Sequence, residues 1–362
     1  MIKGSWSTTG SLAVARSAFT ITVLSSGKVL VAGGQVDSTG GAWAATATAE
    51  IYDPSTRAWS TVAPMASPRR FACSALLPSG RVLVAGGESP ANGALATAEV
   101  YDPVGNAWSA TAGPMAAKRL SATCTSLGLA SGQVLVSGGS HTGGVERTAE
   151  LYDPATGLFT PTGSMVTGRT FHTATPLLTG QVLVVGGADV ATFDTTTPSA
   201  EEYDPASGTW SDASALPGGF GVGGHTATLL PTGEVLVAGG CHVGSGSCPD
   251  APDQRHVSLF SPGSRTWTDK GSLLIGRTLG AALLLSTGDV LIAAGDYHTM
   301  GGGTERYETA TGKIGGGPGM LTSHGDRVGA AGLGDGTWLV VGGILLDGAT
   351  VQNSRVAEIF TE

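Results

Sequence analysis

Histidine is the residue type in this chain whose side chain is best suited to metal or proton chemistry, and the sequence contains seven copies of it. His172 and His225 lie at equivalent positions of two successive copies of a repeated unit. Two neutral imidazoles on neighbouring elements could bind Zn, Cu, Ni or Fe. Alternatively, each imidazole is a hydrogen-bonded side chain with a structural role only. The pair is therefore a candidate metal or catalytic centre, and both interpretations stay open at this point.

A site of two histidines would be weak and poorly selective, so further ligands are required. His242, Asp296 and His298 each follow a glycine doublet or its weakened copy within three residues. Loops from neighbouring units would have to bring them to the first pair. The sequence has no HExxH or other closely spaced ligand motif, so it does not identify the metal.

An arginine stands near the start of most units, and it has two interpretations. The arginines could form a cationic collar that recognises carboxylate, phosphate or sulfate. They could instead pair with a glutamate that recurs in the third segment of the unit, as structural residues do. Arg169 and Arg277 are retained as candidate ligand-binding residues. The arginines are Arg16, Arg69 or Arg70, Arg119, Arg169, Arg277 and Arg327, and the glutamates are Glu50, Glu99, Glu150, Glu201, Glu305 and Glu358.

Two aromatic residues fall outside the repeat pattern. Trp43 follows the first doublet and lies between Gly41 and Ala45, and Tyr297 follows the sixth doublet. Either ring could stack on a sugar or an aromatic ligand, or could only pack within its own loop. Trp6, Trp59, Trp108, Trp210 and Trp267 recur with the unit instead, so we expect them to be packing residues.

The repeated unit that must position these residues is marked by a hydrophobic segment such as VLVAGG. The glycine doublets, or the weakened copy Ala-Gly, begin at 33, 86, 138, 186, 239, 294 and 342, at intervals of 48 to 55 residues. Seven such units account for the whole chain of 362 residues. We therefore expect one domain that spans residues 1–362.

Each unit contains four segments that read as short β-strands. An apolar run is joined by a Ser/Thr-Gly turn to the VLVAGG strand, as in a hairpin. A third strand ends in Tyr-Asp-Pro, which is a turn starter, and a fourth carries the recurring aromatic residue. Four strands repeated seven times predict an all-β fold, a seven-bladed β-propeller. The chain ends after a third strand, so we expect residues 4–8 to complete the last blade and close the ring.

This strand order places the loops that follow the doublets on one face, here called the top face, together with the connections into each first strand. All seven histidines map to that face. Blades four to six would bring His172 and His225 beside the central channel. In blade five, Val222 replaces the arginine within a glycine-rich stretch at 217–224. That stretch is a candidate ligand entrance, or only a flexible loop.

The glycine doublet, Tyr-Asp-Pro and the spaced tryptophan, at a period near 50, resemble kelch repeats. This resemblance implies a propeller but little about function, because kelch propellers include binding scaffolds and enzymes. The segment from His225 through Gly239-Gly240-Cys241 to Cys248 is similar to a copper-bearing blade of the galactose oxidase family. That family has a Tyr-His pair at the inner strand, whereas Gly224 precedes the histidine here.

Four cysteines allow one predicted pairing. Cys241 and Cys248 flank Gly-Ser-Gly, which can bend the chain far enough for a disulfide. Cys73 and Cys124 lie in separate inner strands and are expected to be buried free thiols. A disulfide favours an oxidising compartment, so a secreted or periplasmic location is predicted.

Composition excludes several partners. The net charge is −9 and there is no basic surface pattern, so we expect no nucleic acid partner. No apolar run approaches the roughly 20 residues of a membrane-spanning helix. No P-loop is present, so we expect no nucleotide cofactor. The protein is expected to be a monomer.

Three functions remain open after these exclusions. The favoured one is a ligand-binding propeller with its site on the top face near the channel, where a His-ligated transition metal would lie if one is bound. Its partner would be a glycan, a peptide, a small molecule or a protein. The alternatives are a metal-dependent enzyme that uses the top-face histidines and a metal-free enzyme similar to kelch sugar mutarotases or epimerases.

Overall fold

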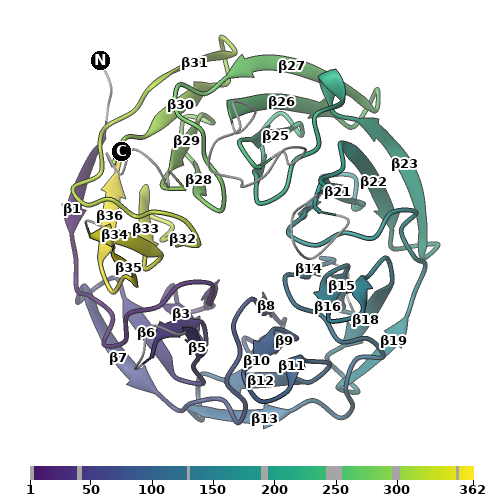
Figure 1. Ribbon diagram of the computed structural model, residues 1–362, viewed down its shortest axis with the longest axis vertical. Helices are drawn as coiled ribbons and strands as arrows, with labels where there is room; N and C mark the ends of the chain where they lie inside the picture. The colour runs from purple at the N-terminus through teal and green to yellow at the C-terminus, as the bar shows by residue number, and fades with distance from the viewer. Residues whose placement is uncertain are drawn as a thin grey trace.

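The computed structural model describes residues 4–38, 43–128, 131–188, 195–241, 255–295, 302–347 and 350–362. Within these ranges, seven four-stranded antiparallel sheets are arranged as blades around a central axis (Figure 1). The predicted seven-bladed β-propeller is therefore confirmed. No helix in the described ranges is long and apolar enough to cross a membrane.

The strands of each blade follow the chain from the axis to the rim. Blade one comprises β2 (Thr20–Val23), β3 (Val29–Ala32), β6 (Ala49–Asp53) and β7 (Ala58–Val62), and blade two comprises β8 (Cys73–Leu76), β9 (Val82–Ala85), β12 (Ala98–Asp102) and β13 (Ala107–Ala110). Blade three comprises β14 (Thr123–Ser126), β15 (Val134–Ser137), β18 (Ala149–Asp153) and β19 (Leu158–Pro161). Blade four comprises β20 (Thr173–Pro176), β21 (Val182–Val185), β22 (Ser199–Asp204) and β23 (Thr209–Ala215).

The remaining blades have the same order, except that the first strand of the chain supplies the last position of blade seven. Blade five comprises β24 (Thr226–Leu229), β25 (Val235–Ala238), β26 (His256–Ser261) and β27 (Thr266–Ser272). Blade six comprises β28 (Ala281–Leu284), β29 (Val290–Ala293), β30 (Glu305–Glu308) and β31 (Lys313–Gly316). Blade seven comprises β32 (Gly329–Gly332), β33 (Thr337–Val341), β36 (Ala357–Thr361) and β1 (Ser5–Thr8).

The connections on the top face contain short two-stranded ribbons and one 3₁₀ turn. The ribbons pair β4 (Gln35–Asp37) with β5 (Trp43–Ala45), β10 (Glu88–Ser89) with β11 (Gly93–Ala94), β16 (Ser140–His141) with β17 (Gly144–Val145), and β34 (Ile344–Asp347) with β35 (Thr350–Asn353). The 3₁₀ turn η1 (Pro217–Gly219) lies in the glycine-rich stretch before blade five.

The glycine doublets are required because two chain segments approach closely where each second strand ends. The second strand is buried along its whole length in blade one, since other blades pack against both of its faces. Gly33 and Gly34 follow it with φ of +68° and +107°, in the left-handed region that favours glycine. A Cβ on Gly33 would lie 2.4 Å from the carbonyl oxygen of Arg69 in the next blade. The doublet thus lets neighbouring blades touch through their backbones.

The recurring tryptophans pack between blades, as predicted. The ring of Trp59 lies 5.1 Å from that of Tyr52 in the same blade. Its indole nitrogen donates a hydrogen bond of 2.8 Å to the carbonyl of Gly10, in the segment that follows blade seven's outer strand. Trp108 repeats this bond one blade later, to Ala63 at 2.7 Å. Each indole therefore fastens its blade to the preceding one.

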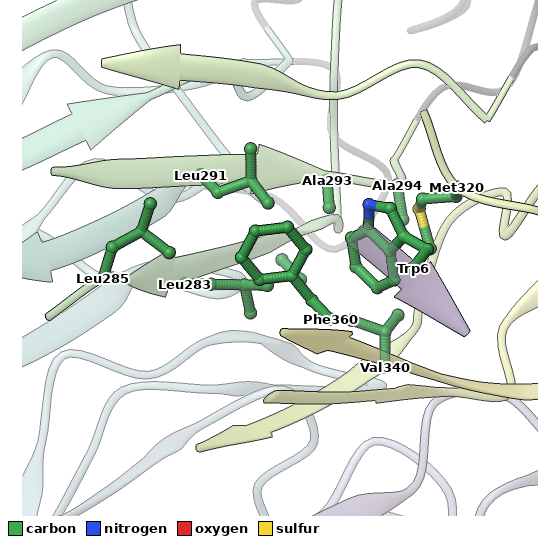
Figure 2. Packing of buried hydrophobic residues seen from close by; sticks show 10 residues of the cluster. Trp6, Leu283, Leu285, Leu291, Ala293, Ala294, Met320, Val340 and Phe360 are labelled. Atoms are coloured by element: carbon green, nitrogen blue, oxygen red, sulfur yellow. The ribbon is translucent and has the colours of Figure 1, made fainter. Parts of the chain in front are cut away.

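The N-terminal strand closes the ring, which confirms the expected completion of the last blade. β1 pairs antiparallel with β36, with Trp6 opposite Phe360. In Figure 1 the first strand lies beside the last strand of the chain at the rim. Figure 2 shows Trp6 and Phe360 packed together with Leu283 and Leu291 of blade six. The chain ends are thus held by both hydrogen bonds and a shared apolar core.

Buried ion pairs account for the repeated arginines. Arg16 Nη2 lies 2.8 Å from Glu50 Oε1, and both side chains are almost completely buried. The same guanidinium donates to the carbonyl of Gly33 at 2.7 Å, so it also anchors the doublet. Equivalent pairs join Arg69 to Glu99, Arg119 to Glu150, Arg169 to Glu201 and Arg277 to Glu305. The structural interpretation of these five arginines is the one the geometry bears out.

Blade seven does not contain the pair of Arg327 with Glu358 that the structural interpretation of the arginines implies. His324 occupies the arginine position instead. Its Nδ1 lies 3.0 Å from the carbonyl oxygen of Gly342, the first residue of the doublet, and its Nε2 lies 3.6 Å from Glu358 Oε1. Arg327 stands three residues further along the chain, which frees it from the repeated network.

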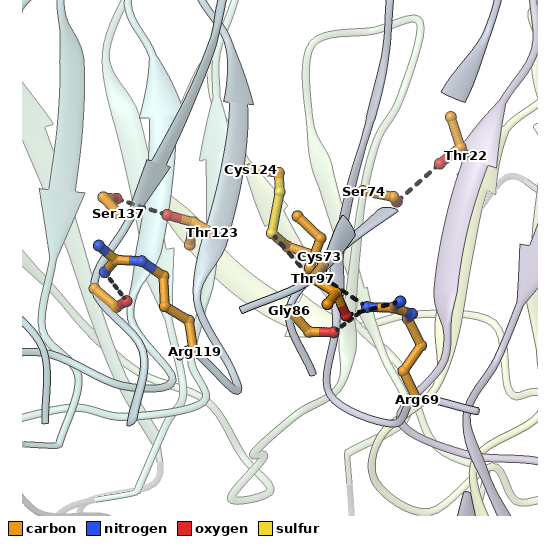
Figure 3. The surroundings of a disulfide bond; sticks show 12 residues. Thr22, Arg69, Cys73, Ser74, Gly86, Thr97, Arg119, Thr123, Cys124 and Ser137 are labelled. Atoms are coloured by element: carbon orange, nitrogen blue, oxygen red, sulfur yellow. Dashed lines mark hydrogen bonds between the residues drawn. A yellow bond between two sulfur atoms is a disulfide. The ribbon is translucent and has the colours of Figure 1, made fainter. Parts of the chain in front are cut away.

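The expectation that Cys73 and Cys124 are free thiols is also wrong, because they form a disulfide. Figure 3 shows the bond between the inner strands of blades two and three. The cysteines are 51 residues apart, about one repeat, so the propeller places them on adjacent strands with their Cα atoms 5.3 Å apart. Cys241 is disulfide-bonded as well. Its predicted partner, Cys248, lies outside the described residues.

Candidate functional site

A ring of seven residues surrounds the axis at the top face, with one residue from the segment that leads into each inner strand. In every blade the backbone N–H of this residue donates to the carbonyl of its counterpart in the preceding blade, at 2.6 to 3.3 Å. Six members are not glycine, yet all six have φ between 50° and 58°. The members are Ala18, Phe71, Ser121, Phe171, Gly224, Leu279 and Arg327. We call this set the axial ring.

The axial ring borders a cavity of about 280 Å³, here called the channel-mouth cavity. Each ring residue contributes to its wall together with the residue that follows it. The following residues are Phe19, Ala72, Ala122, His172, His225, Gly280 and Val328. Because the backbone of the ring is the same in all seven blades, the differences among these side chains give the cavity its chemistry.

One side of the cavity is aromatic. The rings of Phe71 and Phe171 meet edge to face, with their centroids 5.8 Å apart. Ser121 is the ring member between them, and its buried hydroxyl has no hydrogen-bond partner in the described part of the chain. This side therefore offers two apolar surfaces with one unused polar atom, a combination typical of small-molecule sites.

The guanidinium of Arg327 supplies the cavity with a positive charge. It lies over the ring of Phe71, 5.4 Å from the centroid, and its Nε comes no closer than 3.9 Å to Asp326. Burial raises the pKa of Asp326, although the charge of Arg327 opposes that shift. Arg70 also lies over Phe71, at 5.6 Å, but it is paired with Glu88 at 2.7 Å. Arg327 is thus the cation at this cavity with the weakest internal partner.

His172 and His225 form a third part of the wall, and each is only 6% exposed. His172 Nε2 lies 3.2 Å from the hydroxyl of Thr123, and His225 Nε2 lies 2.8 Å from that of Thr173. Each imidazole therefore reaches back to the inner strand of the preceding blade. Burial lowers the pKa of both residues to about 3, and the charge of Arg169 adds to the effect. Both rings are neutral near pH 7.

The described residues do not by themselves provide a complete metal site. No three His, Cys, Asp or Glu side chains converge anywhere in the part of the chain that the structure describes. The two imidazoles are on adjacent blades, but each Nε2 already meets a threonine hydroxyl. The other predicted ligands, His242, Asp296 and His298, lie outside the described residues.

The remaining predicted ligand-binding residues are not brought to the cavity. Arg169 and Arg277 are buried in the ion pairs described above and are absent from its wall. Trp43 begins β5 and is 39% exposed, in a ribbon away from the cavity lining. Tyr297 lies outside the described residues. The glycine-rich stretch contributes Gly224 to the axial ring, while Val222 is buried.

Sequence reasoning missed Phe71, Ser121, Phe171 and Leu279 as wall residues. One signal could have found them. When the seven units are aligned on their doublets, with two extra residues allowed in the first hairpin of blade three, these residues fall in a single column that varies among Ala, Phe, Ser, Gly, Leu and Arg. Variation in one column beside constant structural columns is typical of a position that serves binding and not packing.

Comparisons with known proteins agree with this architecture. A Kelch motif matches residues 22–66 and 69–115, which cover the first two repeats. No curated protein sequence matches the chain. Beyond the motif, the chain is similar to known proteins in its three-dimensional structure.

Two solved structures have the same fold at low sequence identity. A fungal alcohol oxidase of the AA5 family, in complex with copper, superposes with a TM-score of 0.76 and 18% identity, covering 99% of this chain and 76% of the oxidase chain. YjhT superposes with a TM-score of 0.61 and 15% identity, covering 86% of this chain and 100% of its own. The chain is therefore a seven-bladed β-propeller whose first two repeats match the Kelch motif, and its fold is similar to that of the fungal alcohol oxidase.

Proposed function

We propose that this protein is a ligand-binding propeller whose site is the channel-mouth cavity, and that its ligand is a small organic acid with a ring-shaped or apolar body. The observation that carries the proposal is the position of Arg327. Its guanidinium borders the cavity above Phe71, and its nearest acidic neighbour among the described residues, Asp326, is 3.9 Å away. A carboxylate on the ligand would give this cation the short, charge-assisted hydrogen bonds it lacks.

The rest of the wall suits the body of such a ligand. Phe71, Phe171 and Leu279 would bury its apolar surface, which contributes roughly 25 cal/mol per Å². The hydroxyl of Ser121 is available to a polar substituent. His172 and His225 add no charge, because their low pKa keeps them neutral. Arg327 would therefore act in an otherwise uncharged wall and select for an anion.

Calorimetric titration with paired probes tests this function. Benzoate and glucuronate are the acids, and benzamide and glucose are the uncharged controls. We expect an acid to bind and its control to bind at least tenfold more weakly, since a hydrogen bond to a charged group contributes roughly 1.5–3 kcal/mol. Arg327→Gln should remove the preference for benzoate over benzamide, whereas Arg57→Gln, in an exposed turn on the opposite face, should retain it. Equal binding of acids and neutral controls would contradict the proposal.

A metal-dependent enzyme is the second candidate function, and two observations favour it. A structurally similar oxidase binds copper, and two neutral imidazoles lie on adjacent blades beside the channel. His172 and His225, with His242, Asp296 and His298, would be the ligands of Cu, Zn, Ni or Fe. Elemental analysis after exposure to each metal tests this candidate. Stoichiometric metal that is lost in the His172→Ala/His225→Ala variant would support it, and none in the unaltered protein would exclude it.

We also infer that the protein works in an oxidising compartment, as a secreted or periplasmic protein. The disulfide between Cys73 and Cys124 and the bonded state of Cys241 support this location. Fractionation of the natural source should find the protein outside the cytoplasm with its disulfides intact. Reduced protein in the cytoplasm would contradict the inference.

A further inference from the structure

A second cavity of about 250 Å³ lies between blades two and three, near the bottom-face turns. It is bordered by the Ser-Gly turn of blade two, the end of β13 and the Asp-Pro turn of blade three. Each inner strand begins at the channel mouth and ends at a Ser/Thr-Gly turn. The channel-mouth cavity and this second cavity therefore lie at opposite ends of the inner strands. We call this second cavity the blade 2–3 cleft.

The buried tyrosines of the Tyr-Asp-Pro segments show what is normal at such a position. In blade one, the hydroxyl of Tyr52 lies 2.6 Å from the hydroxyl of Thr9, which precedes the blade. Blade four repeats this contact between Tyr203 and Thr162 at 2.8 Å. In blade two, the hydroxyl of Tyr101 donates to an asparagine of its own turn at 3.0 Å. These tyrosine hydroxyls are therefore satisfied internally.

Blade three breaks this pattern. Its tyrosine, Tyr152, has no side-chain hydrogen bond within the described ranges, and it borders the cleft. Thr111 occupies the position of Thr9, but its hydroxyl donates to the carbonyl of Gly113 at 2.8 Å. Phe159 replaces the repeated tryptophan, so no indole N–H reaches back across this interface. Two inter-blade hydrogen bonds are thus missing where the cleft opens.

The same cleft contains a basic side chain whose counterpart elsewhere is neutralised. In blade one, Lys28 forms an ion pair of 2.9 Å with Asp53. Arg81 takes the place of Lys28 in blade two, yet its guanidinium has no ion pair within 4.0 Å in the described structure, not even with Asp102. Burial raises the pKa of Tyr152, and the charge of Arg81 opposes this shift, as a guanidinium near the hydroxyl would. Arg81 also lowers the pKa of Asp102, though less than backbone hydrogen bonds do.

We propose that the blade 2–3 cleft is a binding site for a small hydroxylated carboxylate, such as a hydroxy acid or an acidic sugar. Arg81 would hold the carboxylate, and the hydroxyl of Tyr152 would donate a second hydrogen bond to it. The hydroxyls of Ser79 and Ser109 border the same space and suit the hydroxyls of the ligand. The site is independent of the channel-mouth cavity and does not require the function proposed for it.

The test uses the full chain with the Arg327→Gln substitution, so that carboxylate binding at the channel mouth is weakened. Calorimetric titration with glucuronate should then show one site, which glucose does not occupy. Arg81→Gln should weaken the binding more than tenfold, and Tyr152→Phe should weaken it several-fold. Lys28→Gln is the matched control, because Lys28 occupies the equivalent position in blade one, and it should leave the affinity unchanged.

Three results would overturn the inference. Glucuronate could fail to bind the Arg327→Gln protein, or its affinity could survive Arg81→Gln. Sulfate could bind as tightly as glucuronate, which would make the cleft a general anion site without recognition of ligand hydroxyls. Thermal unfolding of each variant establishes that a lost affinity does not reflect a lost fold. The results expected at the blade 2–3 cleft do not depend on whether the channel mouth binds a carboxylate.

Discussion

The backbone N–H of Ala18 donates to the carbonyl of Arg327 at 3.3 Å, and this bond completes the axial ring of seven. It joins the first blade to the seventh near the axis, while the pairing of β1 with β36 closes the last blade at the rim. The ring of blades is therefore closed both near the axis and at the rim. Because each ring residue is held by its neighbour, the side chains around the channel mouth are fixed by the whole circle of blades.

Trp6 should carry much of the rim closure. Its indole donates to the carbonyl of Pro318 at 2.8 Å, and its ring packs against Phe360 at 5.2 Å. Trp6→Ala removes both contacts and leaves a cavity, so we expect the free energy of unfolding to fall by about 3–5 kcal/mol. Denaturant unfolding followed by circular dichroism measures this loss. Trp43→Ala is the control: Trp43 is 39% exposed, and its replacement should change stability by about 0.5 kcal/mol or less. Equal effects would show that Trp6 is not part of the closure.

The disulfide between Cys73 and Cys124 should stabilise the fold by restricting the unfolded chain. The two residues are 51 positions apart, and loop-closure entropy for that separation corresponds to about 4 kcal/mol. The Cys73→Ser/Cys124→Ser variant should therefore unfold at lower denaturant concentration. Mass spectrometry after alkylation in denaturant without reductant should find both cysteines unmodified in the original protein. Alkylation of either one would contradict the pairing.

The blades could be predicted from the sequence because their determinants are local and repeated. Glycine doublets such as Gly33-Gly34 mark the end of each second strand, and Trp6 matches the tryptophan of a fourth strand that the last unit lacks. Period and strand count then determine the propeller. The same logic, applied to Cys73 and Cys124, would have paired them, since a separation of one repeat means adjacent inner strands.

Most of the candidate site could not be predicted, because its geometry depends on backbone states that sequence does not signal. Phe71 and Leu279 adopt positive φ, which neither residue favours by itself. The contacts with the neighbouring blades impose that conformation and direct both residues to the cavity. His324 takes the role of the repeated arginine, because its imidazole donates to the carbonyl of Gly342 and lies near the carboxylate of Glu358. The repeated arginine therefore does not reveal that Glu358 is partnered by a histidine in blade seven, which leaves Arg327 outside the network of ion pairs.

The buried histidines should make stability depend on pH in the acidic range. Both have a folded pKa of about 3, below the roughly 6.5 of an unfolded histidine. The unfolded chain therefore binds more protons between these values, and stability falls as the pH drops from 6.5 toward 3. At pH 5 each histidine should account for a loss of about 2 kcal/mol.

Comparison of variants isolates this contribution from that of the carboxylates. The His172→Gln/His225→Gln variant should lose less stability between pH 7 and pH 5 than the original protein. His141→Gln is the control, because the side chain of His141 is 32% exposed. Parallel pH profiles for the double variant and the original protein would mean that the two imidazoles are not held neutral by burial.

Arg169 and Arg327 should respond in opposite ways to the same substitution, although both stand near the entry to an inner strand. Arg169 is buried, with its guanidinium 2.9 Å from Glu201 and 2.7 Å from the carbonyl of Gly186. Arg169→Gln leaves the Glu201 carboxylate buried without its partner, so stability should fall by about 3–5 kcal/mol. Arg327 is 30% exposed with an ion pair of 3.9 Å, so Arg327→Gln should cost about 1 kcal/mol or less. Chemical denaturation of the two variants measures the difference. A large loss for Arg327→Gln would place that residue in the structural network and remove the weakly paired cation on which the channel-mouth site depends.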